Sequence, residues 1–95
     1  MTYELEFLPS AQKEWRKLGY TVREQFTRKL RRVLEEPHRP AARLHAMPDC
    51  YKIKLKDSGY RLVYRVIDRV VVVQVVAIGK RDGDVYDDAI GRLDS

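Results

Sequence analysis

The sequence predicts an α+β fold: an antiparallel-rich four-stranded sheet with an N-terminal helical hairpin packed on one face and a short C-terminal helix. Three observations predict it. A short alternating segment opens the chain, two stretches with helical periodicity follow, and three strand-like segments fill most of the second half. At 95 residues the chain suits one domain with a thin core, so residues 1–95 are expected to form a single unit.

The first strand and helix are expected within residues 3–18. Apolar side chains alternate with two glutamates over residues 3–7, which indicates a strand with one acidic, solvated face. Pro9 suits the first position of the following helix, where an amide would have no partner, and Gly19 is expected to end it. The apolar stripe of this helix comprises Ala11, Trp15 and Leu18.

A second helix is expected from Thr21 to the residues before Pro37. Thr21 and Glu24 have the spacing of a capping box at its start. Its apolar face comprises Val22, Phe26, Leu30, Val33 and Leu34. Its other face carries Arg23, Arg28, Lys29, Arg31 and Arg32. Solvation of this basic face is the simplest interpretation, and contact with RNA is the alternative.

Residues 38–48 form an irregular segment because prolines interrupt it. Residues 41–44 are expected to make either a turn of helix or a short edge strand. His45 stands alone in a basic loop, which favours a solvated or phosphate-contacting side chain over a catalytic base.

The stretch from Tyr51 to Arg65 is expected to form a β-hairpin that turns at residues 57–59. Alternation puts Lys52 and Lys54 on the face opposite the apolar side chains. In the expected register Leu55 faces Tyr60, and Lys54 faces Arg61. Like charges directly opposite each other weaken a sheet, so the crowded cations favour a site that binds an anion over a merely solvated face.

The β-branched segment from Val70 to Ile78 predicts a central strand. If Ile67 pairs with Val70, then Gln74 faces Val63. A last helix is expected over residues 85–93, with Asp84 as its N-cap. The helical hairpin would cover one face of the sheet, and the face that carries the cations is expected to stay open.

Charge and composition narrow the class of function. The net charge is +5 overall, but it is +2 over residues 1–36, +7 over residues 37–81 and −4 over residues 82–95. The concentration of cations on the strands points to nucleic acid. Cys50 is the one cysteine, which excludes an internal disulfide, and no signal peptide or membrane-spanning run is evident, so a cytoplasmic location is expected.

The residue types favour phosphate chemistry without a metal or other cofactor. The sequence offers no carboxylate cluster for Mg²⁺, no zinc set and no Ser/His/Asp set. RNA can be cleaved by a base that deprotonates the 2′-OH, cations that stabilise the phosphorane and an acid at the leaving oxygen. Lys54 beside Arg61 is a candidate base, since a nearby cation lowers a lysine pKa. Tyr86 could stack on a base or hydrogen-bond the 2′-oxygen.

Several motifs make the chain resemble the RelE family of toxins from RelBE toxin–antitoxin modules. They are Trp15–Gly19, Thr21–Gln25, Met47–Leu55, Ser58–Tyr64 and Gly79–Arg81. The resemblance implies a small metal-independent RNase of the cytoplasm that enters the ribosomal A site, cuts mRNA there by 2′-OH attack and stops translation. It further implies a RelB-like antitoxin, contacts with small-subunit rRNA, and operator DNA bound through the antitoxin complex.

The resemblance also assigns site residues. Lys52 and Lys54 would share the base function, Arg61 would hold the scissile phosphate, Arg81 would stabilise charge at the leaving group, and Tyr86 would orient the substrate. Further RNA contacts are expected from Arg43, His45, Lys56, Arg65 and Lys80. Two departures from the family pattern are the His45-Ala46 pair, where a basic residue and glycine are usual, and a loop before Tyr86 that looks one residue short.

Two other functions stay open at this point. A ParE-like toxin would poison DNA gyrase through protein contacts, and the full set of basic site residues argues against it. A translation inhibitor that binds the ribosome without cleaving RNA is the second alternative.

Overall fold

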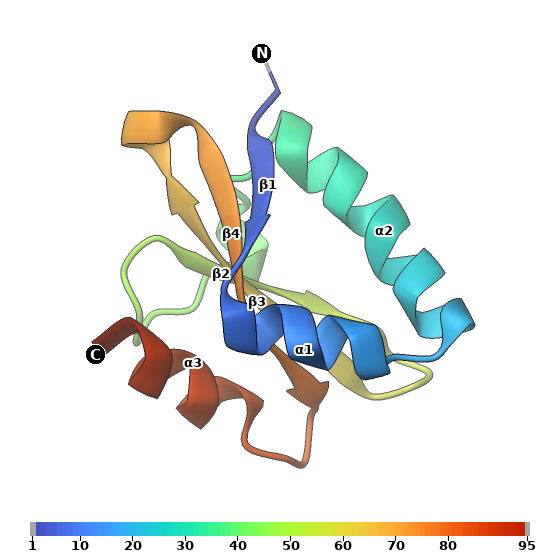
Figure 1. Ribbon diagram of the computed structural model, residues 1–95. Coiled ribbons are helices and arrows are strands. Elements are labelled where there is room, and N and C mark those ends of the chain that lie inside the picture. Colours follow the sequence, from blue (N-terminus) through green and yellow to red (C-terminus); the bar gives the residue numbers. More distant parts are fainter. Residues whose placement is uncertain (1, 95) are drawn as a thin grey trace.

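The computed structural model describes residues 2–94 and shows a sheet between helices (Figure 1). The elements are β1 (Glu4–Phe7), α1 (Pro9–Lys17), α2 (Tyr20–Glu35), β2 (Cys50–Lys54), β3 (Tyr60–Ile67), β4 (Val72–Lys80) and α3 (Val85–Asp94), with 3-10 turns at Pro40–Ala42 and Asp68–Val70. Among the described residues, no helix is long and apolar enough to cross a membrane.

The four strands lie in the order β1-β4-β3-β2, with β1 parallel to β4 and the other pairs antiparallel. This confirms the predicted α+β class. Strand β1 forms one edge of the sheet beside β4, and the two N-terminal helices carry the chain over the sheet before the meander begins (Figure 1). Strand β2 forms the opposite edge.

The N-terminal helices cover one face of the sheet, as predicted. Their buried side chains share a core with the strands, and Phe26 of α2 and Tyr64 of β3 are both fully buried in it. Trp15 packs against this core and lies near Phe7 and Phe26. The apolar stripe of α2 accounts for its position, since Leu30 and Val33 follow Phe26 on the same side of the helix.

The opposite face of the sheet is not fully open, so that prediction was wrong. Helix α3 packs on its centre and forms a second core with the strands and the loop before β2. Val85 and Ala89 are the buried α3 residues, and they meet Val63 and Ala77 of the sheet. The sequence pattern predicted this helix but not its packing on the sheet, because its apolar stripe is narrow and its first turn is acidic.

Two details of the helix termini differ from the prediction. Helix α2 begins at Tyr20 with Gly19 as its N-cap, and no side-chain hydrogen bond caps it, so the expected capping box at Thr21 does not form. The carbonyl of Gly19 instead accepts the amide of Arg23 at 3.1 Å. Gly19 has an extended backbone conformation (φ −66°, ψ 160°), so it separates the helices without adopting a left-handed conformation. The predicted helical start at Pro9 is confirmed.

The register between β3 and β4 also differs from the prediction. Ile67 pairs with Val72 and Arg65 pairs with Gln74, so Gln74 does not face Val63. The 3-10 turn and a left-handed Val71 (φ 57°) make the connection longer than the two-residue turn that a pairing of Ile67 with Val70 would require. A register shift between Val63 and Tyr64 then moves the later pairs by one residue.

An ion pair closes the edge of β4 where β1 has ended. Strand β1 stops at Phe7 opposite Val75, which leaves later backbone groups of β4 without a strand neighbour on that side. The Ile78 amide donates to Glu14 Oε1 at 3.0 Å, and Arg92 Nη1 donates to the Val76 carbonyl at 2.8 Å. Arg92 and Glu14 also form a bidentate pair at 2.8 and 3.0 Å, which ties α3 to α1 across the sheet edge.

Candidate active site

The candidate site is built on a row of three residues across the meander. Lys54 of β2 pairs with Arg61 of β3, and Arg61 pairs with Gly79 of β4. The predicted hairpin register is therefore confirmed, and two cations stand directly opposite each other on neighbouring strands. Lys52 lies two residues along β2 on the same face, opposite Val63.

The lysines and the arginine of this row differ in burial. Lys54 is exposed and Lys52 is half-buried, whereas Arg61 is only 7% exposed. Arg61 Nη1 donates to the Tyr60 carbonyl at 3.1 Å. Among residues 2–94, only Arg65 has a side-chain polar atom that is buried without a hydrogen-bond partner. The other guanidinium donors of Arg61 are therefore not sealed off and stay accessible for a ligand.

Arg81 follows β4 directly and lies beside the turn of the hairpin. Its amide donates to the carbonyl of Gly59 at 2.8 Å, which fixes the backbone while the side chain stays exposed. Gly59 has a φ of +76°, a left-handed conformation that suits glycine. The preceding Lys80 pairs with Tyr60 and places its ammonium 5.3 Å from the centre of that ring.

Tyr86 reaches the site from the start of α3. The preceding Val85 packs against Gly79, where an added Cβ would lie 3.4 Å from the Val85 Cβ. This contact holds the first turn of α3 next to the row of Lys54, Arg61 and Gly79. Tyr86 is half-buried against the second core. A short loop with a turn at Gly83, whose amide bonds the Lys80 carbonyl at 3.0 Å, joins the strand to this helix.

The structure thus gathers the five predicted catalytic residues at one end of the meander. Lys52 and Lys54 come from β2, Arg61 from β3, Arg81 from the end of β4 and Tyr86 from α3. Of the predicted RNA contacts, Lys56 and Lys80 lie next to this end of the sheet. Arg43 and His45 are exposed in the loop before β2, where Arg43 bridges to Tyr51.

Arg65 does not join this group. Its Nη2 donates to Gln74 Oε1 at 3.1 Å, and Gln74 Nε2 donates to Glu6 Oε1 at 2.9 Å, so a polar chain crosses three strands. Its Nε atom is buried without a partner. Arg65 also lies near the thiol of Cys50, whose pKa burial raises to about 11 despite the cation. Its surroundings are those of a structural residue.

A second polar cluster joins the other end of the sheet to the segment after α2. The carboxylate of Asp68 accepts hydrogen bonds from the hydroxyl of Tyr3 at 2.5 Å and from His38 Nε2 at 2.8 Å. These two donors hold the pKa of Asp68 below its ordinary value. His38 Nδ1 lies 3.0 Å from the hydroxyl of Tyr51. The ring of Tyr51 stacks on the ring of Tyr64. Burial raises the pKa of Tyr64, and its hydroxyl donates a hydrogen bond to the Pro37 carbonyl.

The residues gathered at this end of the meander can bind and stabilise an anion in several ways. Two cations face each other, a buried guanidinium keeps free donors, an exposed arginine stands at the strand end, and a tyrosine borders them. Such a set can hold a phosphate, neutralise charge that develops during transfer and stack on a base. The described residues contain no group of three or more side chains suited to hold a metal ion.

Sequence reasoning missed two features that shape the site. Helix α2 stands beside β2, so its basic residues Arg28, Lys29 and Arg32 line a hollow together with Lys54 and Lys56. The sequence located these cations on one helix face but not beside the strand. The Glu14–Arg92 ion pair, which holds α3 against α1, joins residues 78 positions apart, and no local sequence pattern predicts such a pair.

The sequence and the fold of this chain are similar to those of known toxins. Residues 5–85 match the family described as the ParE toxin of type II toxin–antitoxin systems, parDE. The chain is 58% identical over 94 residues to the mRNA interferase toxin RelE of Escherichia coli K12, covering 98% of this chain and 99% of that protein. A free double-arginine variant of E. coli RelE superposes with a TM-score of 0.91 at 57% identity, over 98% of this chain and 99% of that one.

The toxin in the intact E. coli RelBE toxin–antitoxin complex is also similar. It superposes with a TM-score of 0.83 at 60% identity, covering 85% of this chain and 99% of that one.

Proposed function

The chain belongs to the RelE/ParE family of type II toxins, and we propose that it cleaves mRNA in the ribosomal A site. It is a type II toxin and an endoribonuclease, because its full length is 58% identical to an mRNA interferase. The family description mentions ParE, but the high identity is to RelE, which disfavours the gyrase-poisoning alternative. A RelB-type antitoxin is its partner. The ribosome, the operator DNA and the cytoplasmic location are parts of the proposal.

The single observation that best supports the proposal is the pairing of Lys54 with Arg61, with Gly79 as the third member of the row. A phosphate held by Arg61 lies between a lysine on one side and the start of α3 on the other. Lys54, with Lys52 beside it, would remove the proton of the 2′-OH. The attack forms a cyclic phosphate and breaks the bond from phosphorus to the 5′-oxygen. Arg81 would stabilise the charge on that oxygen until a proton from solvent completes the 5′-hydroxyl.

Dependence on the ribosome follows from what the site lacks. Lysine and arginine are slow proton donors at neutral pH, so the chemistry relies on a substrate held in an attacking geometry. The site is a shallow face at one end of a sheet. A partner that presents the codon in a fixed, splayed conformation would supply the missing orientation, and we propose that the ribosomal A site is this partner.

Primer extension on mRNA recovered from cells that express the chain tests the proposal. We expect new 5′ ends at a fixed position within codons, and none in cells that express the Arg81→Ala variant. Arrest of translation without such cuts would favour an inhibitor that only binds the ribosome. DNA damage with translation intact would favour a gyrase poison.

A further inference from the structure

We infer that the basic groove between α2 and the free edge of β2 binds the phosphodiester backbone of RNA, an inference that rests on the proposed function and extends its site on to α2. The basic groove is defined here by Arg28, Lys29 and Arg32 of α2, with Lys54 and Lys56 opposite them. Gln25, Leu55 and Asp57 complete its lining.

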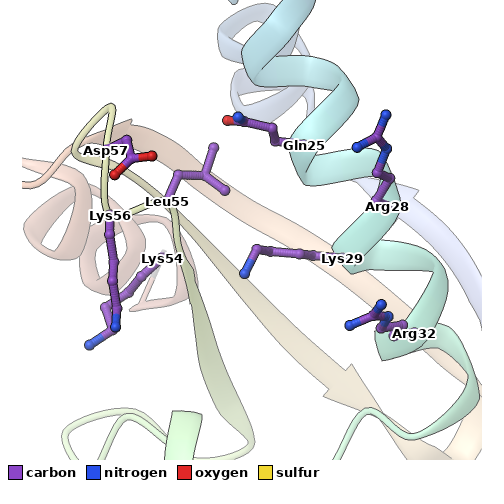
Figure 2. Close-up of a pocket in the computed structure, with 8 residues that line it drawn as sticks. All are labelled: Gln25, Arg28, Lys29, Arg32, Lys54, Leu55, Lys56 and Asp57. Carbon is purple, nitrogen blue, oxygen red and sulfur yellow. The ribbon is translucent and has the colours of Figure 1, made fainter.

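The groove is large enough for an extended polymer segment and is lined mainly by cations. Its volume is about 500 Å³, and a neighbouring hollow of about 300 Å³ shares four of its cations and adds Lys52 and Arg39. Asp57 is the one carboxylate in either lining. Figure 2 shows Lys29 reaching from α2 toward the strand, while Lys54 and Lys56 extend side by side along the opposite wall.

These cations are not neutralised by the protein. No described carboxylate forms an ion pair with any of the five cations that define the groove, since the two ion pairs among residues 2–94 lie elsewhere. Arg28 and Arg32 are one helical turn apart, and like charges at that spacing destabilise a helix. A fold that keeps unpaired like charges on two facing walls is stabilised when an anion enters between them.

The spacing of the cations suits a polyanion with a regular repeat. Four residues along α2 correspond to about 6 Å, at 1.5 Å per residue. Lys52 and Lys54, which alternate along the extended strand β2, are about 6.6 Å apart at roughly 3.3 Å per residue. Both walls therefore repeat their positive charge at about the interval between successive phosphates of an extended RNA strand. Arginine in addition binds phosphate oxygens in a bidentate manner.

Continuity with the active site favours RNA over an acidic protein segment as the occupant. Lys54 belongs both to the active-site row and to the groove lining, and Lys52 lines the adjoining hollow. An RNA whose scissile phosphate lies at Arg61 therefore has a continuous cationic path from the row around the edge of β2. The cleaved strand and ribosomal RNA are the two possible sources of this backbone, because both present the same phosphodiester chemistry.

The test uses two double variants that carry the same loss of charge on the same helix. Arg28→Gln with Arg32→Gln removes two groove cations. Arg23→Gln with Arg31→Gln is the matched control, since those two residues line other hollows of α2. Binding to mRNA-free ribosomes and cleavage on mRNA-programmed ribosomes are measured over a range of salt concentrations, and thermal unfolding verifies that both variants fold.

We expect the groove variant to need at least about tenfold more ribosomes for half-maximal cleavage, with less than a twofold change in rate at saturation. The dependence of log affinity on log salt should become shallower by roughly 1.5, since each lost phosphate contact contributes about 0.7–0.9. The control should behave as the wild type. Weaker binding that is already present without mRNA identifies ribosomal RNA, whereas weakening only with long mRNA identifies the cleaved strand.

Two results would overturn the inference. One is equal ribosome requirement and salt slope for the groove and control variants. The other is loss of antitoxin binding by the groove variant with ribosome binding unchanged, which would assign the groove to an acidic protein segment. Failure of the proposed function is distinguishable, because a wild-type chain that binds ribosomes but never cleaves mRNA would contradict the enzyme and leave the groove result intact.

Discussion

Individual side chains of the candidate active site differ in burial, and their proposed roles differ accordingly. Arg61 is buried and oriented by its neighbours, so it suits a fixed phosphate contact. Lys54 and Arg81 are exposed and can follow a substrate during the reaction. Pre-oriented charges lower a barrier most when they need no rearrangement, which makes the buried guanidinium the anchor of the set.

The Arg81→Ala variant tests the role of an exposed cation. We expect cleavage of ribosome-bound mRNA to fall by about a hundredfold or more, the usual effect of removing one charge-stabilising group. Unfolding and antitoxin binding should not change, because the fold uses only the backbone amide of this residue. Arg69→Ala, at an exposed site in the turn before β4, is the control. A folding defect in Arg81→Ala would show that the side chain is structural.

The Asp68 cluster makes a separate prediction about pH. Its hydrogen bonds from Tyr3 and His38 place the pKa of Asp68 below the ordinary value of 3.8. The stabilisation is therefore complete above pH 3.8 and is lost as the pH falls through the lower folded-state pKa. Asp68→Asn should be less stable than the wild type at neutral pH, and the difference should shrink in acid.

Denaturant unfolding at a series of pH values measures this effect, with Asp82→Asn at an exposed position as the control. If the difference in unfolding free energy between wild type and Asp68→Asn stayed constant into strong acid, it would contradict the role given to the carboxylate.

For individual residues, the sequence predicted which side chains share a face of the sheet better than it predicted the contacts that each side chain makes. The alternation of Tyr51 to Arg65 predicted which residues share a face, and the Lys54–Arg61 pair followed from the turn. Arg65 is also among the expected RNA contacts, but in the structure its side chain donates a hydrogen bond to Gln74. That bond depends on the register of β4, which a 3-10 turn and a left-handed valine shift away from simple pairing.

Among the elements, α3 links stability to activity. It supplies Tyr86, rests on Gly79 through Val85 and is tied to α1 by the pair of Arg92 with Glu14. The helix is short and would be unstable alone, so these tertiary contacts hold it in place. Its burial on the cationic face was not apparent from the sequence, because a narrow apolar stripe does not reveal which surface it meets.

The Arg92→Met variant tests this attachment. We expect a loss of about 2 kcal/mol in unfolding free energy, since the change removes charge-assisted hydrogen bonds and leaves Glu14 partly buried with one fewer partner. Amides of α3 should also exchange faster with solvent than those of β3 and β4. Arg69→Met is the matched control. Unchanged exchange in α3 would mean that Val85 and Ala89 alone hold the helix.

For the whole molecule, the architecture separates two surfaces of the same sheet. One face is covered by the helical hairpin and carries most of the core, and α3 packs on the other face (Figure 1). The proposed catalytic cations Lys54 and Arg61 lie on that second face. The order of strands and helices was predictable from periodicity and turn residues. The adjacency of α2 to β2, which creates the basic groove, was not, because it depends on how far the helix stands from the sheet.

The distribution of charge over the whole molecule supports the proposed ribosomal partner. The net charge of residues 37–81 is +7, and the structure concentrates much of it at one end of the meander and along the edge of β2. This asymmetry supports the proposal that phosphate charge attracts the molecule to the ribosome. The candidate site lacks an efficient proton donor, so in the proposed mechanism the ribosome also supplies the oriented substrate.

The most direct test of this account compares free and ribosome-bound mRNA as substrates for the purified chain. An end-labelled mRNA is incubated alone or on ribosomes with a vacant A site, and the fragments are mapped and their 3′ ends analysed by mass spectrometry. We predict rapid cleavage within the A-site codon, a 2′,3′-cyclic phosphate at the new end, and little cleavage of the free RNA. Equal cleavage of free RNA, or a stalled ribosome with intact mRNA, would contradict it.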